Sequence, residues 1–319
     1  MKRVGLQIAA GVVGGLVLGT GIGYIFFVDH TPHPNTVFTN SNLAQGPILE
    51  SMTISARKVL TDKIAALLSE EKARGNLTEG SIYFRDLNNG PWFGINEDLK
   101  FTPASLLKVP LAIAYFKAAE NKPDLLEQQI EFTGPRGTTI AKYPPRVALE
   151  EHKIYSIEDL IARMLEDSDN DATNILFQFL SKDQTEEVYK DLGIETINDY
   201  EKYSISVRAY SAFFRILYNS TYLSQESSEK ILSMMSESSF TQGISAGVPA
   251  TIKVSQKFGE RTLDTAASIY QLHNCGIIYM PGHPYMLCVM TQGKNYDVLA
   301  GFIQEVSKEV YESILAATT

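Results

Sequence analysis

Two side chains in the motif Ser-Leu-Leu-Lys, at Ser105–Lys108, have the types and spacing that acyl transfer needs. A serine hydroxyl is a weak nucleophile until a base removes its proton. An amine three residues later on one helix lies within reach of that hydroxyl. Ser105 is therefore the candidate nucleophile, and Lys108 is its candidate base.

The surroundings of Ser105 distinguish it from three other Ser-x-x-Lys matches in the chain, at Ser55–Lys58, Ser69–Lys72 and Ser227–Lys230. Those three lie among charged or polar residues, where a solvated helix face is the simpler interpretation. Ser105 instead precedes the apolar run Val109–Phe116, which predicts a buried helix with the serine near its N-terminus. The first N–H groups of a helix have no internal partner, so the Ser105 N–H is a candidate donor to an oxyanion.

A second motif, Ser168-Asp169-Asn170, lies in a polar turn between an amphipathic helix and another helix. One interpretation is helix capping, which these residue types favour. The other is chemical: Ser168 would carry a proton to a leaving group, and the Asn170 amide would hydrogen-bond a substrate amide. The sequence leaves both interpretations open.

A third motif, Lys257-Phe258-Gly259, ends an alternating segment at residues 251–257 that predicts a strand. Lys257 would supply positive charge for a substrate carboxylate. Gly259 would let a substrate backbone approach closely.

In this order and at these spacings, the three motifs resemble the Ser-x-x-Lys, Ser-Asp-Asn and Lys-Thr-Gly elements of class A β-lactamases and penicillin-binding D,D-peptidases. The resemblance extends over about residues 51–317. It includes Gly80–Leu87, which looks like a first strand, and Cys275–Met280 with Tyr285–Met290, which look like late strands. It implies an α+β fold with a five-stranded antiparallel sheet, flanked by helices.

Two early strands, a helical middle and three late strands fit this architecture. The helical middle, at about residues 110–250, would be an inserted all-α subdomain, with the active site between it and the sheet. Helices at Ser51–Arg74 and about Val298–Ala316 are expected to cover one face of the sheet, since both show apolar residues at helical spacing.

The resemblance implies a role for each candidate. Lys108, kept neutral by burial near Lys257, would accept the Ser105 proton. Ser105 would attack an amide or lactam carbonyl, and N–H groups of Ser105 and Glu260 would hold the oxyanion. Ser168, assisted by Lys257, would return a proton to the leaving nitrogen. The substrate-binding set would be Asn170, Phe258, Gly259 and Glu260.

Two departures from the family pattern concern deacylation and carboxylate binding. Class A β-lactamases carry a loop glutamate and, after three intervening residues, an asparagine; the nearest match here, Glu195 with Asn198, has only two between. We therefore interpret Glu195, Asp199 and Glu201 as solvated loop charges. Phe258 stands where the family usually has a hydroxyl residue, so we expect carboxylate binding to be weakened or reshaped.

The N-terminus predicts a membrane anchor. Val4–Val28 contains no charged residue and is long enough to span a bilayer, and the preceding Lys2 and Arg3 put the remainder outside the cytoplasm. We predict an uncleaved signal-anchor at residues 1–28, an extracytoplasmic linker at 29–50 and the hydrolase domain at 51–319, with cleavage left open. Glycines recur every four residues in the anchor, which predicts either weak self-association through that face or simply a glycine-rich span. These glycines are Gly11, Gly15, Gly19 and Gly23.

The two cysteines, Cys275 and Cys288, lie on the arms of a predicted hairpin with a four-residue turn at Pro281–Pro284. That register puts Cys288 opposite Ile277 and diagonal to Cys275. A disulfide and two buried thiols are both compatible with it.

Composition limits the remaining function classes. The chain has 319 residues, 44% of them hydrophobic, and a net charge of −9, which argues against a general nucleic-acid surface. Its five histidines show no metal-ligand spacing, so we expect no metal and no cofactor.

Three functions follow from the residues and the resemblance. The leading one is a membrane-anchored, extracytoplasmic serine hydrolase that acts on β-lactams or on D-Ala-D-Ala-type peptides of peptidoglycan. The second is a D,D-carboxypeptidase or transpeptidase with slow β-lactam turnover, favoured by the missing loop glutamate. The third, favoured by Phe258, is a catalytically weak domain that binds wall peptides or β-lactams.

Overall fold

The computed structural model describes residues 37–40, 52–88, 90–134, 141–197, 199 and 202–318. The predicted membrane anchor and its four-glycine face lie outside these ranges, so both stay predictions. Within the described ranges, no helix is both long enough and apolar enough to cross a bilayer.

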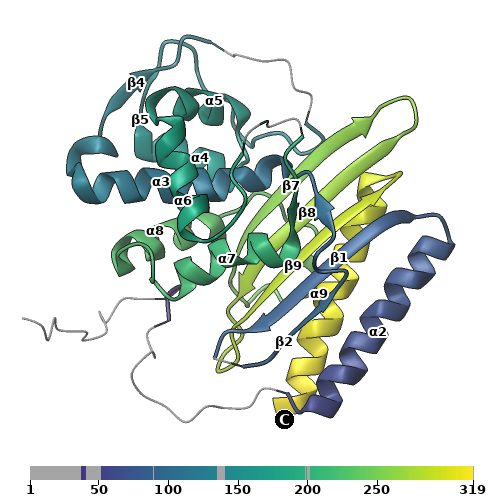
Figure 1. Cartoon of the computed structure of the whole chain (residues 1–319). Helices are drawn as coiled ribbons and strands as arrows, with labels where there is room; N and C mark the ends of the chain where they lie inside the picture. The colour runs from purple at the N-terminus through teal and green to yellow at the C-terminus, as the bar shows by residue number, and fades with distance from the viewer. Residues whose placement is uncertain are drawn as a thin grey trace, which may run out of the picture. The chain divides into compact units, whose positions relative to one another are not determined.

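A five-stranded antiparallel sheet with the order β2-β1-β9-β8-β7 forms the centre of the domain (Figure 1). Its strands are β1 (Leu77–Asp86), β2 (Trp92–Ile95), β7 (Val254–Asp264), β8 (Ile269–Ile278) and β9 (Tyr285–Gly293). The two early strands join the three late ones where β1 pairs with β9. The prediction of an α+β fold around such a sheet is confirmed.

Two long helices cover one face of this sheet (Figure 1). They are α2 (Ile54–Ala73) and α9 (Tyr296–Thr318), which pack against each other as well as on the strands. In α2 the buried residues Leu60, Ile64 and Leu68 recur every four positions, so they form one apolar stripe.

The other face of the sheet carries the helical elements and two short strand pairs. The helical elements are η1 (Ala104–Leu107), α3 (Lys108–Asn121), η2 (Pro123–Leu125), α4 (Ile157–Glu166), α5 (Asn170–Phe179), α6 (Lys182–Asp191), α7 (Val207–Tyr218) and α8 (Gln225–Ser236). The short η3 (Ser245–Gly247) instead packs against α9. The short pairs are β3 (Lys100–Phe101) with β6 (Ile205–Ser206), and β4 (Gln129–Glu131) with β5 (Ile154–Ser156).

Helix α3 is the buried centre of this helical part. All nine residues from Lys108 to Phe116 are buried, and the helix contacts α4, α6 and α8. A helix surrounded on all sides needs apolar residues at nearly every position, which is why this run shows no polar face. Lys108 is the one charged residue in this buried run, and its amine donates hydrogen bonds to Ser168 O and Asn170 Oδ1.

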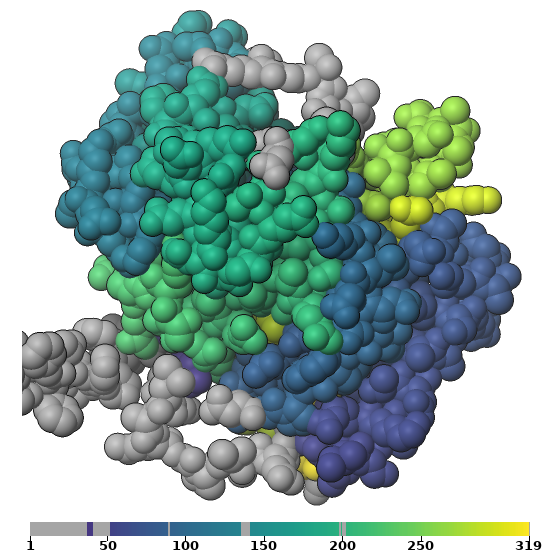
Figure 2. Space-filling model, viewed as in Figure 1, coloured from purple at the N-terminus to yellow at the C-terminus, as the bar shows by residue number. Residues whose placement is uncertain are grey.

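Strands β8 and β9 lie between two hydrophobic cores. Along β9, Met286, Cys288 and Met290 enter the core under the helical part, whereas Leu287 and Val289 enter the core under α2 and α9. Successive side chains of a strand point to opposite faces, so a strand buried on both faces is apolar throughout. Strand β7 is one of the two edge strands of the sheet, and the tip of its hairpin with β8 projects from the body of the domain (Figure 2).

A short stretch of the predicted linker, Val37–Thr39, packs on the domain. The backbone N–H groups of Val37, Phe38 and Thr39 all donate to the Glu229 carboxylate. The Phe38 ring is buried and meets the edge of Tyr279 at 5.3 Å between ring centroids. This stretch is therefore not a free extended spacer.

The hairpin of β8 and β9 differs from the predicted register. Cys275 lies directly opposite Cys288, and a disulfide joins them. The pairing of β8 with β9 ends at Ile278 and Tyr285, while Tyr279 still continues the ladder with β7, because its N–H donates to Lys253 O at 3.0 Å. The connection is thus six residues long instead of four. The predicted pairing of Cys288 with Ile277 is wrong.

This disulfide leads to a prediction about thiol content. Unfolded but unreduced protein should show no free thiol in a colorimetric thiol assay, whereas two thiols per chain would contradict the pairing. Because the bond closes a loop with a sequence separation of 13, the double variant Cys275→Ser, Cys288→Ser should lose about 3 kcal/mol of unfolding free energy in urea.

Candidate active site

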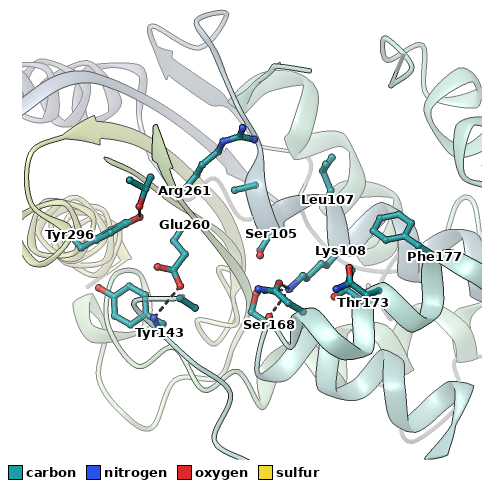
Figure 3. A pocket seen from close by; sticks show the side chains of 15 residues that line it. Ser105, Leu107, Lys108, Tyr143, Ser168, Thr173, Phe177, Glu260, Arg261 and Tyr296 are labelled. Atoms are coloured by element: carbon teal, nitrogen blue, oxygen red, sulfur yellow. Dashed lines mark hydrogen bonds between the residues drawn. The ribbon is translucent and has the colours of Figure 1, made fainter. Parts of the chain in front are cut away.

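A cavity of about 500 Å³ lies where the helical part meets strand β7 (Figure 3). Its walls come from η1 and α3, the segment 141–143, the α4–α5 turn, α5, β7 and the start of α9. The lining residues are Ala104, Ser105, Leu107, Lys108, Ala141, Tyr143, Ser168, Asn170, Thr173, Asn174, Phe177, Glu260, Arg261, Thr262 and Tyr296. The first two motifs, together with the three residues that directly follow the third motif on β7, therefore line one pocket.

Ser105 lies in a tight 3₁₀ turn at the entry to α3. The residue before it, Ala104, has a left-handed backbone (φ +50°), and the Leu106 N–H donates to Pro103 O at 3.0 Å. A non-glycine residue in this region is strained, so the surrounding packing must hold the turn. Within the described part of the chain, no hydrogen bond engages the Ser105 hydroxyl, which faces the pocket in Figure 3.

The packing that holds this turn comes from Gly259. A Cβ on Gly259 would lie 2.8 Å from Pro103 O and 3.1 Å from Leu106 N. Strand β7 can pass this close to the serine turn only because the position has no side chain. The sequence assigned Gly259 to the approach of a substrate backbone; the backbone that approaches it here is the chain's own.

Lys108 is buried in a shell of oxygen atoms. Its Nζ donates to Ser168 O at 2.5 Å, to Asn170 Oδ1 at 2.8 Å and to Ser168 Oγ at 3.2 Å. Burial lowers the pKa of Lys108 to about 7, although the charges of Asp169 and Glu260 oppose that shift. Near neutral pH a large fraction of this amine is therefore unprotonated and able to act as a base.

The turn between α4 and α5 serves capping and the site at once. The Asp169 side chain caps α5 by accepting the N–H groups of Asp171 and Ala172 at 2.8 and 3.1 Å. The neighbouring Ser168 has a left-handed backbone (φ +56°), and its carbonyl and hydroxyl both face Lys108. The capping interpretation is confirmed for Asp169, whereas the chemical roles of Ser168 and Asn170 stay predictions.

An ion pair between Arg146 and Asp167 stabilises the turn between α4 and α5. Arg146 Nε donates to Asp167 Oδ1 at 2.5 Å, and its Nη2 donates to Glu166 Oε2 and to Glu237 O, each at 3.2 Å. A charge-assisted bond to a carboxylate with only a tenth of its side chain exposed is stronger than a surface pair. Arg146 therefore ties the strained Ser168 turn to the end of α8.

Lys257 and Phe258 lie beneath the pocket lining instead of in it. Lys257 is fully buried, and its Nζ donates to Phe258 O at 3.0 Å. Burial and the nearby charge of Lys108 hold the pKa of Lys257 well below its usual value. Phe258 is 1% exposed and stacks on Phe240 in the core under α2 and α9. Its ring therefore does not reach a ligand in this pocket directly.

The two described loop carboxylates, Glu195 and Asp199, do not line the pocket. Glu195 pairs with Lys100 at 2.9 Å and its side chain is 67% exposed, in agreement with its interpretation as a solvated charge. Asp199 pairs with Lys202 at 3.3 Å. Asn198 and Glu201 lie outside the described residues. Among the residues that are described, no group of three or more His, Cys, Asp or Glu side chains could hold a metal ion.

Several lining residues were not predicted from the sequence. On α5, Thr173, Asn174 and Phe177 follow Asn170 at intervals of three, four and seven residues, which is the spacing of one helix face. That signal was available once Asn170 was singled out. Tyr143 and Tyr296 come from a loop and a distant helix, and no local pattern connects them with the motifs.

The family comparison agrees with this geometry. A model described as the β-lactamase enzyme family matches residues 58–314. A curated relative, the β-lactamase regulatory protein BlaB of Streptomyces cacaoi, is 32% identical over 130 residues. That match covers 39% of this chain and 39% of the relative, so the chain spans about two fifths of the relative's length.

Solved structures share the fold at low sequence identity. A variant of PBP-A, solved as an acyl-enzyme complex with penicillin G, has a TM-score of 0.67 at 21% identity and covers 84% of this chain and 99% of that one. A β-lactamase from Xanthomonas campestris has a TM-score of 0.67 at 20% identity, with coverage of 80% and 98%. A class A β-lactamase from Mycobacterium abscessus has a TM-score of 0.65 at 21% identity and covers 80% of this chain and 98% of that one. Likeness at this identity concerns the fold alone.

The close approach of β7 to the serine turn predicts the effect of adding one methyl group. Gly259→Ala should lose about 1–3 kcal/mol of unfolding free energy, because the new Cβ meets backbone atoms that cannot rotate away. Gly301→Ala on α9 is the matched control, since a Cβ there meets nothing within 4 Å; it should be stabilising by about 0.5–1 kcal/mol. Equal urea midpoints for the two variants would contradict this account of Gly259.

Proposed function

Because this chain belongs to the β-lactamase enzyme family, we propose that it forms an acyl-enzyme on Ser105 with β-lactams or with D-Ala-D-Ala-type peptides of the cell wall. The observation that carries the proposal is the buried Lys108 amine, which is three residues from Ser105 and hydrogen-bonded to Ser168 and Asn170. A base with a pKa of about 7 beside a serine is what activation of a hydroxyl requires.

The proposed reaction moves one proton and exchanges one bond. Lys108 takes the Ser105 proton as the serine oxygen bonds to the carbonyl carbon, and the N–H groups of Ser105 and Glu260 hold the resulting oxyanion. When the carbon–nitrogen bond breaks, the proton passes through the Ser168 hydroxyl, 3.2 Å from Lys108 Nζ, to the leaving nitrogen. With a β-lactam the nitrogen stays attached, so the adduct has the mass of the whole drug.

A second candidate is a peptidase-type enzyme that releases its acyl group slowly. The pairing of Glu195 with Lys100 supports it, because the nearest match to the family's loop glutamate is turned toward solvent. The name of the relative BlaB supports a third candidate, a catalytically weak regulatory domain that binds β-lactams or wall peptides. The lifetime of the adduct distinguishes the three.

We also propose that this domain works outside the cytoplasm, tethered by the predicted anchor at residues 1–28. The uncharged stretch after Lys2 and Arg3 supports that location. Such a location would bring the pocket to peptidoglycan and to β-lactams from the medium. It is also an oxidising environment in which a disulfide persists.

Intact-mass spectrometry tests acylation. Full-length protein mixed with penicillin G should gain the mass of one drug molecule, and Ser105→Ala should gain none. A transient adduct with accumulating hydrolysed drug would indicate β-lactamase activity, and a persistent one would indicate the peptidase type. An adduct that forms unchanged on Ser105→Ala would refute the assignment of the nucleophile.

The lowered pKa of Lys108 predicts the pH dependence of that step. Its unprotonated form is the base, so the acylation rate should rise with pH through about 7 and level off above it. Acylation rates are measured by intact mass in reactions stopped at successive times, at pH values between 5.5 and 9. A midpoint near the ordinary lysine value, or a Lys108→Arg variant that acylates at the original rate, would show that another group is the base.

A further inference from the structure

The side chain of Glu260 has a role that its backbone N–H does not explain. It points into the pocket, toward the segment 141–143 (Figure 3). One carboxylate oxygen accepts the Lys142 N–H at 2.9 Å, and the other accepts the Tyr143 N–H at 3.0 Å. Both bonds are to backbone, so they hold the path of the chain whatever its side chains are.

The same segment is attached at two further points. Lys142 Nζ pairs with Asp297 at 3.2 Å, and Tyr143 Oη donates to Gln242 Oε1 at 3.1 Å. The Tyr143 ring meets Phe240 and Phe258 edge-on, with centroids 4.9 and 5.8 Å apart. Phe258 thus supports the pocket wall from below, and Glu260 ties that wall to β7 from within.

The Glu260 carboxylate also sets the charge of the pocket. Among the described lining residues it is the only carboxylate. Its charge raises the pKa of Lys108 and of Lys257 against the effect of burial, so it acts on both lysines of the site. The guanidinium of Arg261, the next residue on β7, extends away from Glu260 in Figure 3.

A ligand carboxylate that lies near the third motif would therefore be repelled by the negative charge of Glu260. The position that follows Lys257 offers no hydroxyl to bind it, because Phe258 is buried in the core. Repulsion between two unit charges about 7 Å apart, at an effective dielectric constant of about 20 to 80, corresponds to about a 3- to 50-fold change in rate.

We propose that Glu260 is a specificity-determining residue: it latches the 142–143 backbone across β7 and disfavours acyl donors with a free carboxylate beside the carbonyl that Ser105 attacks. Among the proposed donors, those whose carboxylate is esterified or absent are then preferred over those whose carboxylate is free. This inference rests on the acylation of Ser105 proposed above.

The test compares one probe with and without its carboxylate. Penicillin G and its methyl ester are each mixed with full-length protein and with Glu260→Gln, and acylation rates are followed by intact mass. The variant should acylate about 3- to 50-fold faster with the acid, because the like charge is gone. Its rate with the ester should change less than about 2-fold, because the ester carries no charge for Glu260 to repel.

Two further variants separate charge from structure. Glu260→Asp keeps the charge and should keep the wild-type preference for the ester. Glu195→Gln removes an exposed carboxylate that pairs with Lys100 outside the pocket, so it should leave both rates unchanged.

Each remaining outcome has a distinct meaning. Equal effects of Glu260→Gln on both probes would overturn the specificity role and leave the carboxylate as a structural latch alone. Labelling of Ser105 by neither probe, in wild type and variant alike, would instead overturn the proposed acylation itself. The ester therefore separates failure of this inference from failure of the proposed function.

Discussion

Keeping the Lys108 amine out of water is the constraint on which the site depends. An amine buried in the middle of a helical core needs oxygen acceptors, and the turn between α4 and α5 supplies them. That demand accounts for the left-handed backbone of Ser168, for the cap that Asp169 forms on α5, and for the ion pair of Arg146 with Asp167 behind the turn. Burial at the same time makes the amine a base near neutral pH.

A second constraint joins the helical part to the sheet. The nucleophile turn and strand β7 approach so closely that only a glycine fits at position 259, and this contact aligns the first motif with the third. The residues on either side of Gly259 are two positions apart on β7, so they lie on the same face of the strand, and both contact Tyr143. Phe258 enters the core and supports Tyr143, while the Glu260 side chain enters the pocket.

The charge pattern of the pocket follows from these placements. Two lysines that would ordinarily be positive have lowered pKa values because they are buried, while Glu260 accepts two backbone N–H groups at the pocket wall. A lysine pair of this kind is suited to moving a proton between nucleophile and leaving group. A carboxylate beside it discriminates among ligands by their charge. In the proposed function, reactivity and selectivity thus come from different residues of neighbouring elements.

The sequence by itself determined the features that depend on the spacing of residues close together in the chain. Ser105 and Lys108 are one helical turn apart, Ser168 to Asn170 occupy a single turn, and the strands and covering helices show their own periodicity. From these, and from the resemblance of the three motifs to a known family, the fold and five of the pocket residues could be predicted.

Only the tertiary structure decided the features that depend on contacts between residues far apart in the chain. The pairing of Cys275 with Cys288 depends on the register of β8 with β9 and on a six-residue connection between them, which no turn signal shows. The neighbours of Gly259 and Glu260 lie more than 100 residues earlier in the chain. Such contacts arise where separate elements pack, and the free energy that selects them belongs to the assembled core instead of to any short segment.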